Sequence, residues 1–184
     1  MKTAGTGIKL LIGDIVEQKT NAIVNAANHR LMGGGGVDGA IHRAGGPKIM
    51  EECKKIRKNE YPNGLPTGKA VMTTGGKLDA RFVIHTVGPI WEGGKFGEEE
   101  KLSEAYKNSL RLAQSKGLRS ISFPSISTGA YGFPVDIASE VAIKTVIDYL
   151  KKNKAFSEVR FIVFSEHDYG VYNGVLDKFS IVSD

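Results

Sequence analysis

The sequence from Val24 to His42 reads VNAANHRLMGGGGVDGAIH and indicates an apolar strand, a glycine-rich loop and the start of a helix. Four consecutive glycines, Gly33 to Gly36, lie between the strand and the helix. Glycine loses more conformational freedom on folding than any other residue, so packing alone does not favour such a run. We infer that a ligand approaches the backbone of these glycines closely.

Two phosphate-binding patterns match this sequence only in part. A G-x-G-x-x-G pattern, typical of dinucleotide sites, begins at Gly34, but residues 28–32 separate it from the preceding strand. The segment Gly64–Lys69 resembles a phosphate loop, yet it is one residue short and continues with Ala70, so it does not support Mg²⁺ binding. Both patterns share a run of backbone N–H donors before a helix, which binds anions. An anion site and a mobile surface linker remain the alternatives for these glycines.

Polar residues on either side of the glycines are candidates for chemistry. The amide of Asn28 can both donate and accept hydrogen bonds, which suits a sugar diol, but a left-handed turn residue at the strand end is the alternative. Asp38 can act as a general base or hold a ribose hydroxyl, and it also suits a helix N-cap. His42 follows Asp38 at helical spacing, and we expect it, like Asn25, to be structural.

A second loop of small polar residues, Ser125 to Gly132, follows an apolar strand at 120–124. Its hydroxyl and N–H groups offer further anion contacts, so the two loops predict a diphosphate held between them. Asp14 and Phe164 also lie at expected strand ends. Ligands of parallel α/β sheets bind beyond the carboxyl ends of the strands, which is where these segments are expected.

Six apolar runs alternate with helical patterns along the chain. The runs indicate strands, and they cover residues 8–12, 22–26, 70–74, 81–87, 120–124 and 159–164. The helical patterns cover residues 38–44, 47–59, 102–113, 134–152 and 166–179. We therefore predict an α/β protein, a three-layer α/β/α sandwich with a mixed, mostly parallel six-stranded sheet, formed by residues 1–184 as a single domain.

Composition and charge limit the classes of partner. A formal net charge of +5 mildly favours anionic ligands, but no aromatic residues are interleaved with the basic clusters, so nucleic acid is not an expected partner. A single cysteine excludes an internal disulfide, and the four histidines lack metal-ligand spacing, so neither a metal nor a cofactor is expected. Without a leader-like or membrane-length apolar segment, a soluble, cytoplasmic monomer is expected, with no membrane partner.

Five motifs in order along the chain resemble those of a macro domain, in particular the MacroD-type branch that includes bacterial O-acetyl-ADP-ribose deacetylases. They are GDI at 13–15, NAAN at 25–28, GGGGVDGAIH at 33–42, HTVGP at 85–89 and SISTGAYG at 125–132. The resemblance covers nearly the whole chain. It implies ADP-ribose as the ligand, deacetylation of O-acetyl-ADP-ribose and removal of mono-ADP-ribose from acidic side chains of proteins. A non-catalytic reader of ADP-ribose is the alternative, although macro domains that only bind often lack the aspartate that stands here at position 38.

The resemblance also implies a role for each site residue. Asp14 would bind the adenine amino group with Ile15 beside it, and Phe164 would stack on adenine unless it is a core phenylalanine. The diphosphate would be gripped by two sets of residues: Gly34, Gly35, Gly36 and Val37, and opposite them Ser127, Thr128, Gly129, Ala130 and Tyr131. Asn28 would hold the distal ribose, which Tyr131 shields, while Asp38 would activate or orient water.

Overall fold

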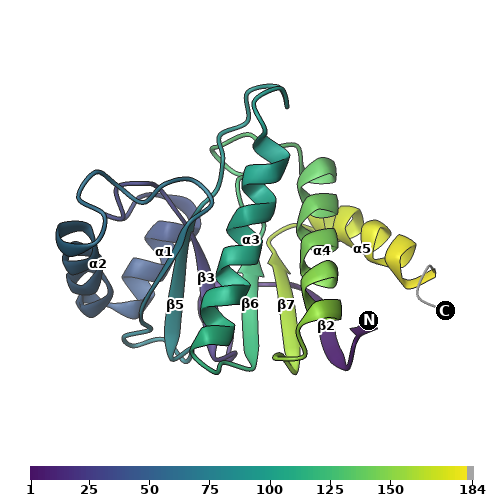
Figure 1. Cartoon of the computed structure of the whole chain (residues 1–184), viewed down its shortest axis with the longest axis horizontal. Coiled ribbons are helices and arrows are strands. Elements are labelled where there is room, and N and C mark those ends of the chain that lie inside the picture. Colours follow the sequence, from purple (N-terminus) through teal and green to yellow (C-terminus); the bar gives the residue numbers. More distant parts are fainter. Residues whose placement is uncertain (182–184) are drawn as a thin grey trace.

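A mixed sheet of seven strands runs through the middle of the computed structural model, which describes residues 1–181 (Figure 1). The strand order is β1-β2-β7-β6-β3-β5-β4, with the inner five strands parallel and the two edge strands antiparallel to their neighbours. The strands are β1 Lys2–Thr3, β2 Thr6–Ile12, β3 Ala22–Ala27, β4 Ala70–Thr74, β5 Phe82–Val87, β6 Ser120–Pro124 and β7 Glu158–Val163.

All six strands expected from the apolar runs are present, and the seventh is the two-residue β1. The sequence did not predict β1, because its two residues are not part of an apolar run. A tight turn at Ala4 and Gly5, both with positive φ, returns the chain and pairs Lys2 with Gly7. The predicted fold class is confirmed, with seven strands in place of six.

Helices cover both faces of the sheet and make the outer layers. The 3₁₀ helix η1 Ile15–Glu17, α1 Gly36–Gly45 and α2 Pro47–Asn59 share one buried apolar cluster with the strands. The helices α3 Glu98–Ser115, α4 Val135–Lys152 and α5 Glu166–Ile181 share the other. Side chains alternate between the two clusters, so that in β3 Ile23 belongs to the first and Val24 to the second. Figure 1 shows α3 and α4 in front of the strands.

A chain of buried aromatic rings supports the loop that follows β6. Tyr106, Phe123, Phe161 and Tyr172 contact one another in sequence, with ring centroids 5.0 to 6.2 Å apart. The Tyr172 hydroxyl donates to Ser125 Oγ at 2.9 Å, and the Tyr106 hydroxyl accepts from the backbone N–H of Ile126 at 3.2 Å. Burial raises the pKa of Tyr172 to about 12, which keeps this hydroxyl a neutral donor. The aromatic core thus fixes the start of the 125–132 loop.

Candidate functional site

Four loops lie side by side at the carboxyl edge of the parallel strands. Asp14 follows β2, Phe164 follows β7, the 125–132 loop follows β6, and Asn28 follows β3. These four strands are consecutive in the sheet. The structure therefore brings the segments predicted at strand ends onto one edge, as expected for a ligand site in a parallel sheet.

The glycine run forms an exposed loop that leads directly into α1. Gly33 and Gly36 have φ of +80° and +55°, which a residue with a side chain rarely adopts. The helix begins at Gly36 with Gly35 as its N-cap, two residues earlier than the sequence predicted. Asp38 is therefore inside the first turn, and its predicted alternative as the N-cap is wrong. The first N–H groups of a helix have no intrahelical acceptor, so they face the loop as anion donors.

The carboxylate of Asp38 is buried and only half satisfied. Its side chain accepts from Asn25 Nδ2 at 2.8 Å through Oδ1, which also lies 3.3 Å from His42 Nε2. Asp38 is only 5% exposed, and within residues 1–181 no hydrogen-bond partner reaches its Oδ2. A buried polar atom without a partner is costly, so this oxygen is a candidate for contact with a ligand or water. The histidine contact confirms the helical spacing expected for His42.

Asn28 and Asp38 converge beneath Gly34. A Cβ atom on Gly34 would stand 3.2 Å from Asp38 Oδ2 and 3.3 Å from Asn28 Nδ2. Asn28 also donates to the carbonyl of Gly33 at 3.0 Å and accepts from the N–H of Arg30 at 3.1 Å. The left-handed residue of this turn is Leu31, so the alternative of Asn28 as a left-handed turn residue is wrong. Its amide instead shapes the glycine loop and reaches the same point as the carboxylate.

Asn25 and His85 position Asp38, a role that the sequence did not reveal. Asn25 Nδ2 contacts both Asp38 Oδ1 and His85 Nδ1, the latter at 3.1 Å, so Nδ1 accepts and the ring proton is on Nε2. His85 Nε2 then donates to the Thr73 hydroxyl at 2.9 Å, which donates to a backbone carbonyl. The one signal in the sequence was the polar residue Asn25 inside an apolar strand, because such an amide needs buried partners.

The buried His85 predicts a loss of stability in acid. Burial, followed by the nearby His42, lowers the pKa of His85 from 6.5 to about 4. Only the unfolded chain then takes up this proton as pH falls below 6.5, so stability present above pH 6.5 is lost towards pH 4, by about 3 kcal/mol. Urea unfolding at pH 7.5 and 4.5 measures the loss. In His85→Gln this loss should shrink, and an equal loss in both proteins would contradict the assignment.

The loop after β6 presents a second set of donors. Ser127 has a φ of +67°, and its buried Oγ has no hydrogen-bond partner within residues 1–181. Thr128 braces the loop, since its hydroxyl contacts Ser125 O at 3.0 Å and Ser125 Oγ at 2.9 Å. Gly129 and Ala130 are exposed, and Tyr131 is half-buried. Gly129 and Ala130 therefore expose backbone that a ligand can reach, Ser127 contributes a buried hydroxyl without a partner, and Thr128 holds the shape of the loop.

At the other end of the edge, Asp14 and Phe164 are free to meet a ligand. Asp14 is half-buried and caps η1, with Oδ1 accepting from the N–H of Val16 at 3.0 Å. Phe164 is 64% exposed, so its alternative as a core phenylalanine is wrong. The side chain of Ile15 is 1% exposed and packs in the core, which leaves only its backbone for ligand contact.

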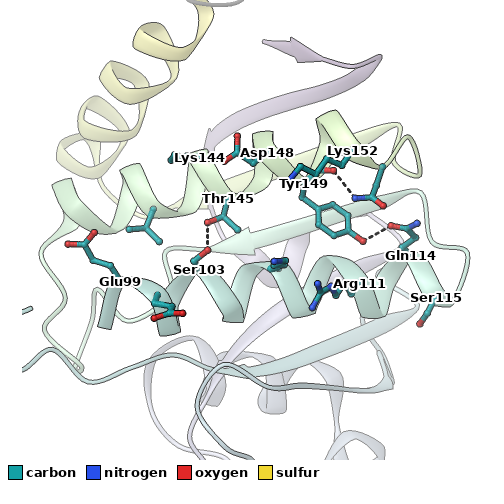
Figure 2. A pocket seen from close by; sticks show the side chains of 14 residues that line it. Glu99, Ser103, Arg111, Gln114, Ser115, Lys144, Thr145, Asp148, Tyr149 and Lys152 are labelled. Carbon is teal, nitrogen blue, oxygen red and sulfur yellow. Dashed lines mark hydrogen bonds and ion pairs between the residues drawn. The ribbon is translucent and has the colours of Figure 1, made fainter. Parts of the chain in front are cut away.

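A large hollow lies elsewhere on the surface. A groove of about 880 Å³ runs between α3 and α4, away from the strand ends, and none of the predicted site residues line it (Figure 2). Its polar groups bond across the groove, as Ser103 does with Thr145 at 2.8 Å and Tyr149 with Gln114 at 2.5 Å. We assign the ligand site to the strand ends, where buried polar atoms remain unpaired.

Two other kinds of feature are absent from residues 1–181. No group of three or more His, Cys, Asp and Glu side chains there is arranged to hold a metal ion. No helix in that range has the length and apolar character needed to cross a membrane.

Comparison with known proteins identifies the same family from sequence and from structure. The model of the macro domain family matches residues 24–142. A macro domain-containing protein of Caldanaerobacter subterraneus subsp. tengcongensis is 56% identical over 171 residues, covering 93% of this chain and 96% of the relative. The O-acetyl-ADP-ribose deacetylase of Escherichia fergusonii is 50% identical over 171 residues, covering 93% and 96%.

A solved structure agrees over nearly the full chain. The macrodomain of Oceanobacillus iheyensis with ADP has a TM-score of 0.94 at 45% identity, covering 98% of this chain and 95% of that one. The same macrodomain has been solved with ADPR as a glycine-to-valine mutant, and as mutants that replace an aspartate or an asparagine by alanine. With a family match over most of its length and close relatives over nearly all of it, this chain belongs to the macro domain family.

Proposed function

We propose that this protein binds ADP-ribose and hydrolyses esters of its distal ribose, both the acetyl ester in O-acetyl-ADP-ribose and the link to acidic side chains of mono-ADP-ribosylated proteins. The observation that carries the proposal is the unpaired, buried Asp38 Oδ2 beside Asn28 Nδ2. The relative from Escherichia fergusonii, named as an O-acetyl-ADP-ribose deacetylase at 50% identity, supports the reaction class.

The proposed ligand lies along the strand ends. Adenine binds at Asp14 and the Ile15 backbone and stacks on Phe164. The diphosphate accepts hydrogen bonds from the two loops, and Asn28 holds the distal ribose that Tyr131 shields. The loop residues are Gly34, Gly35, Gly36 and Val37 on one side and Ser127, Thr128, Gly129, Ala130 and Tyr131 on the other.

The proposed chemistry is general-base hydrolysis of an ester. Asp38 Oδ2 orients a water molecule and accepts its proton while the water oxygen attacks the ester carbonyl carbon. The bond between that carbon and the ribose oxygen breaks, and the ribose oxygen takes up a proton as it leaves. Asn25 and His42 keep Oδ1 occupied, so Oδ2 is the oxygen available to water. Both substrates place the scissile ester on the distal ribose, so one site serves both.

The replaced residues in the Oceanobacillus iheyensis mutants support this assignment by their spacing. There the aspartate is ten positions after the asparagine, and the glycine is seven positions after it. Asn28, Gly35 and Asp38 have the same spacing in this chain.

Purified wild-type protein tests the proposal with two substrates, O-acetyl-ADP-ribose and a protein mono-ADP-ribosylated on glutamate. Release of acetate from the first and of ADP-ribose from the second is the expected result. Calorimetric binding of ADP-ribose without product from either ester after long incubation would contradict the enzyme and select a reader.

The adenine end gives a separate prediction. Asp14→Ala should weaken ADP-ribose binding by about 1 to 3 kcal/mol, roughly 5- to 150-fold, because a hydrogen bond to the adenine amino group is lost. That variant also loses the cap of η1, so Asp14→Asn is the matched control. Its oxygen keeps the bond to the Val16 N–H, but its second polar group is a donor that cannot accept from adenine. Unchanged affinity in both variants, measured by calorimetry, would remove Asp14 from the site.

A further inference from the structure

The strand order predicts where a substrate would continue beyond the distal ribose. Along the carboxyl edge the proposed contacts run from adenine at β2 and β7, through the diphosphate at β6, to the ribose at β3. The next strand is β5, which is parallel to β3. The loop after β5, residues 88–97, therefore lies where a group esterified to that ribose would extend.

A cavity of about 280 Å³ is present at this position. Three of its lining residues connect it to the proposed site. His29 follows Asn28 in the chain, Tyr131 belongs to the diphosphate loop, and Gly88 packs so closely that a Cβ atom there would stand 2.1 Å from Ser127 Oγ. The backbone N–H of Trp91 also donates to the carbonyl of Tyr131 at 2.9 Å. The cavity and the proposed ribose site thus share a wall.

The lining of the cavity combines apolar residues with the charged residues Glu92, Glu98 and Lys101, and the loop that carries many of them is held in place. Ile90 and Phe96 line it and are 57% and 62% exposed, although both are large apolar side chains. The buried carboxylate of Glu98 accepts from the N–H groups of Glu92 and Gly94, each at 3.0 Å, and of Phe96 at 2.7 Å. Burial alone would raise the pKa of Glu98, but these backbone hydrogen bonds together lower it, so the carboxylate stays charged and clamps the loop.

The cavity is larger than an acetyl ester requires. At about 30 Å³ per water molecule, 280 Å³ corresponds to roughly nine waters, whereas an acetyl group has only three non-hydrogen atoms. Exposed apolar side chains on a rigid loop are typical of a surface that binds another apolar group. A polypeptide is an occupant that would fill the extra volume and also cover the apolar side chains. Its esterified side chain enters beside Tyr131, and an apolar neighbour of the modified residue covers Ile90 and Phe96.

We propose that the cavity formed by the 88–97 loop, His29 and Tyr131 is an acceptor subsite for the protein part of a mono-ADP-ribosylated substrate. The proposal rests on the proposed function for the reaction itself. It adds that Ile90 and Phe96 distinguish a modified polypeptide from O-acetyl-ADP-ribose, although the scissile ester is on the same ribose in both.

The double variant Ile90→Ser/Phe96→Ser tests the proposal against two substrates. They are O-acetyl-ADP-ribose and a peptide that carries ADP-ribose on a glutamate flanked by leucine. We expect kcat/KM for the peptide to fall by about tenfold or more and kcat/KM for O-acetyl-ADP-ribose to stay within twofold. Phe96→Leu, which keeps an apolar surface, should retain most of the peptide activity. Val141→Ser, a half-buried apolar residue of α4 that lines the groove between α3 and α4, is the matched control and should change neither.

A binding measurement keeps this test independent of turnover. The modified peptide should bind Asp38→Ala protein about tenfold more tightly than free ADP-ribose does, and adding the double substitution should abolish that difference. Equal losses on both substrates, or unchanged peptide activity and affinity, would overturn the subsite. If wild-type protein hydrolyses neither ester, the proposed function fails, and the affinity difference still decides whether the polypeptide is bound here.

Discussion

Asp38→Ala is expected to bind ADP-ribose within about threefold of the wild type but to lose turnover of O-acetyl-ADP-ribose by on the order of 10²-fold or more. A positioned general base contributes about 10² to 10⁴ in rate, and its removal lowers kcat without removing the contacts of adenine and diphosphate. The buried, unpaired Oδ2 is the atom whose loss should matter. Calorimetry with ADP-ribose and an acetate-release assay measure the two quantities on the same preparation.

A second variant separates the loss of the base from the loss of structure. Asp38→Asn keeps an oxygen that can accept from Asn25 Nδ2, so the buried network stays paired while the basic oxygen is replaced by an amide. We expect the same loss of turnover as in Asp38→Ala, with thermal stability closer to the wild type. Asp136→Ala, in the first turn of α4 and exposed, should leave turnover unchanged. Normal turnover in Asp38→Asn would rule out the carboxylate as base and leave it a structural role.

The outline of the fold follows from local patterns, because apolar runs and helical spacing report how each segment buries its own side chains. The loops at 33–36 and 125–132 were predictable for the same reason: runs of small residues after apolar strands are local signals. The edge strand β1 was not predictable, since Lys2 and Thr3 pair only through a turn and carry no apolar pattern. The start of α1 was also predicted two residues too late, because Gly35 caps this helix without a side chain that would mark the position in the sequence.

The network behind Asp38 was beyond reach of the sequence for a different reason. Asn25 and His85 are paired residues in the register of β3 and β5, although 60 positions separate them in the chain. No local pattern shows that these two strands are neighbours in the sheet. The sequence therefore could not predict that His85, in the HTVGP motif, bonds to Asn25. Cys53 also lies near this histidine, with its Sγ 3.9 Å from His85 Nε2. Burial and the nearby Asp38 raise the pKa of the Cys53 thiol to about 12, so the thiolate is not populated.

The second large effect is expected at Gly39, the last glycine of the G-x-G-x-x-G pattern, to which the sequence assigned no ligand contact. It lies in α1, where a Cβ atom would stand 2.5 Å from the carbonyl oxygen of Gly34, a contact that cannot be relieved by rotating a side chain. Gly39→Ala should therefore push the backbone of Gly34 outward by roughly an ångström. A displacement of that size in a binding or catalytic group costs up to about 10²-fold. We expect ADP-ribose affinity to fall by about 10- to 100-fold, measured by calorimetry.

The same substitution elsewhere shows why this loss would be specific to the site. Alanine is favoured over glycine inside a helix by about 1 kcal/mol, so helix propensity alone would favour Gly39→Ala, and the expected loss of binding comes from the clash with the Gly34 carbonyl. Gly174→Ala, in α5, is the matched control, because a Cβ atom there would meet nothing within 4 Å and affinity should not change. Affinity within twofold of the wild type in Gly39→Ala would mean that the glycine loop adapts freely. The four glycines would then be a flexible linker and not a shaped diphosphate site.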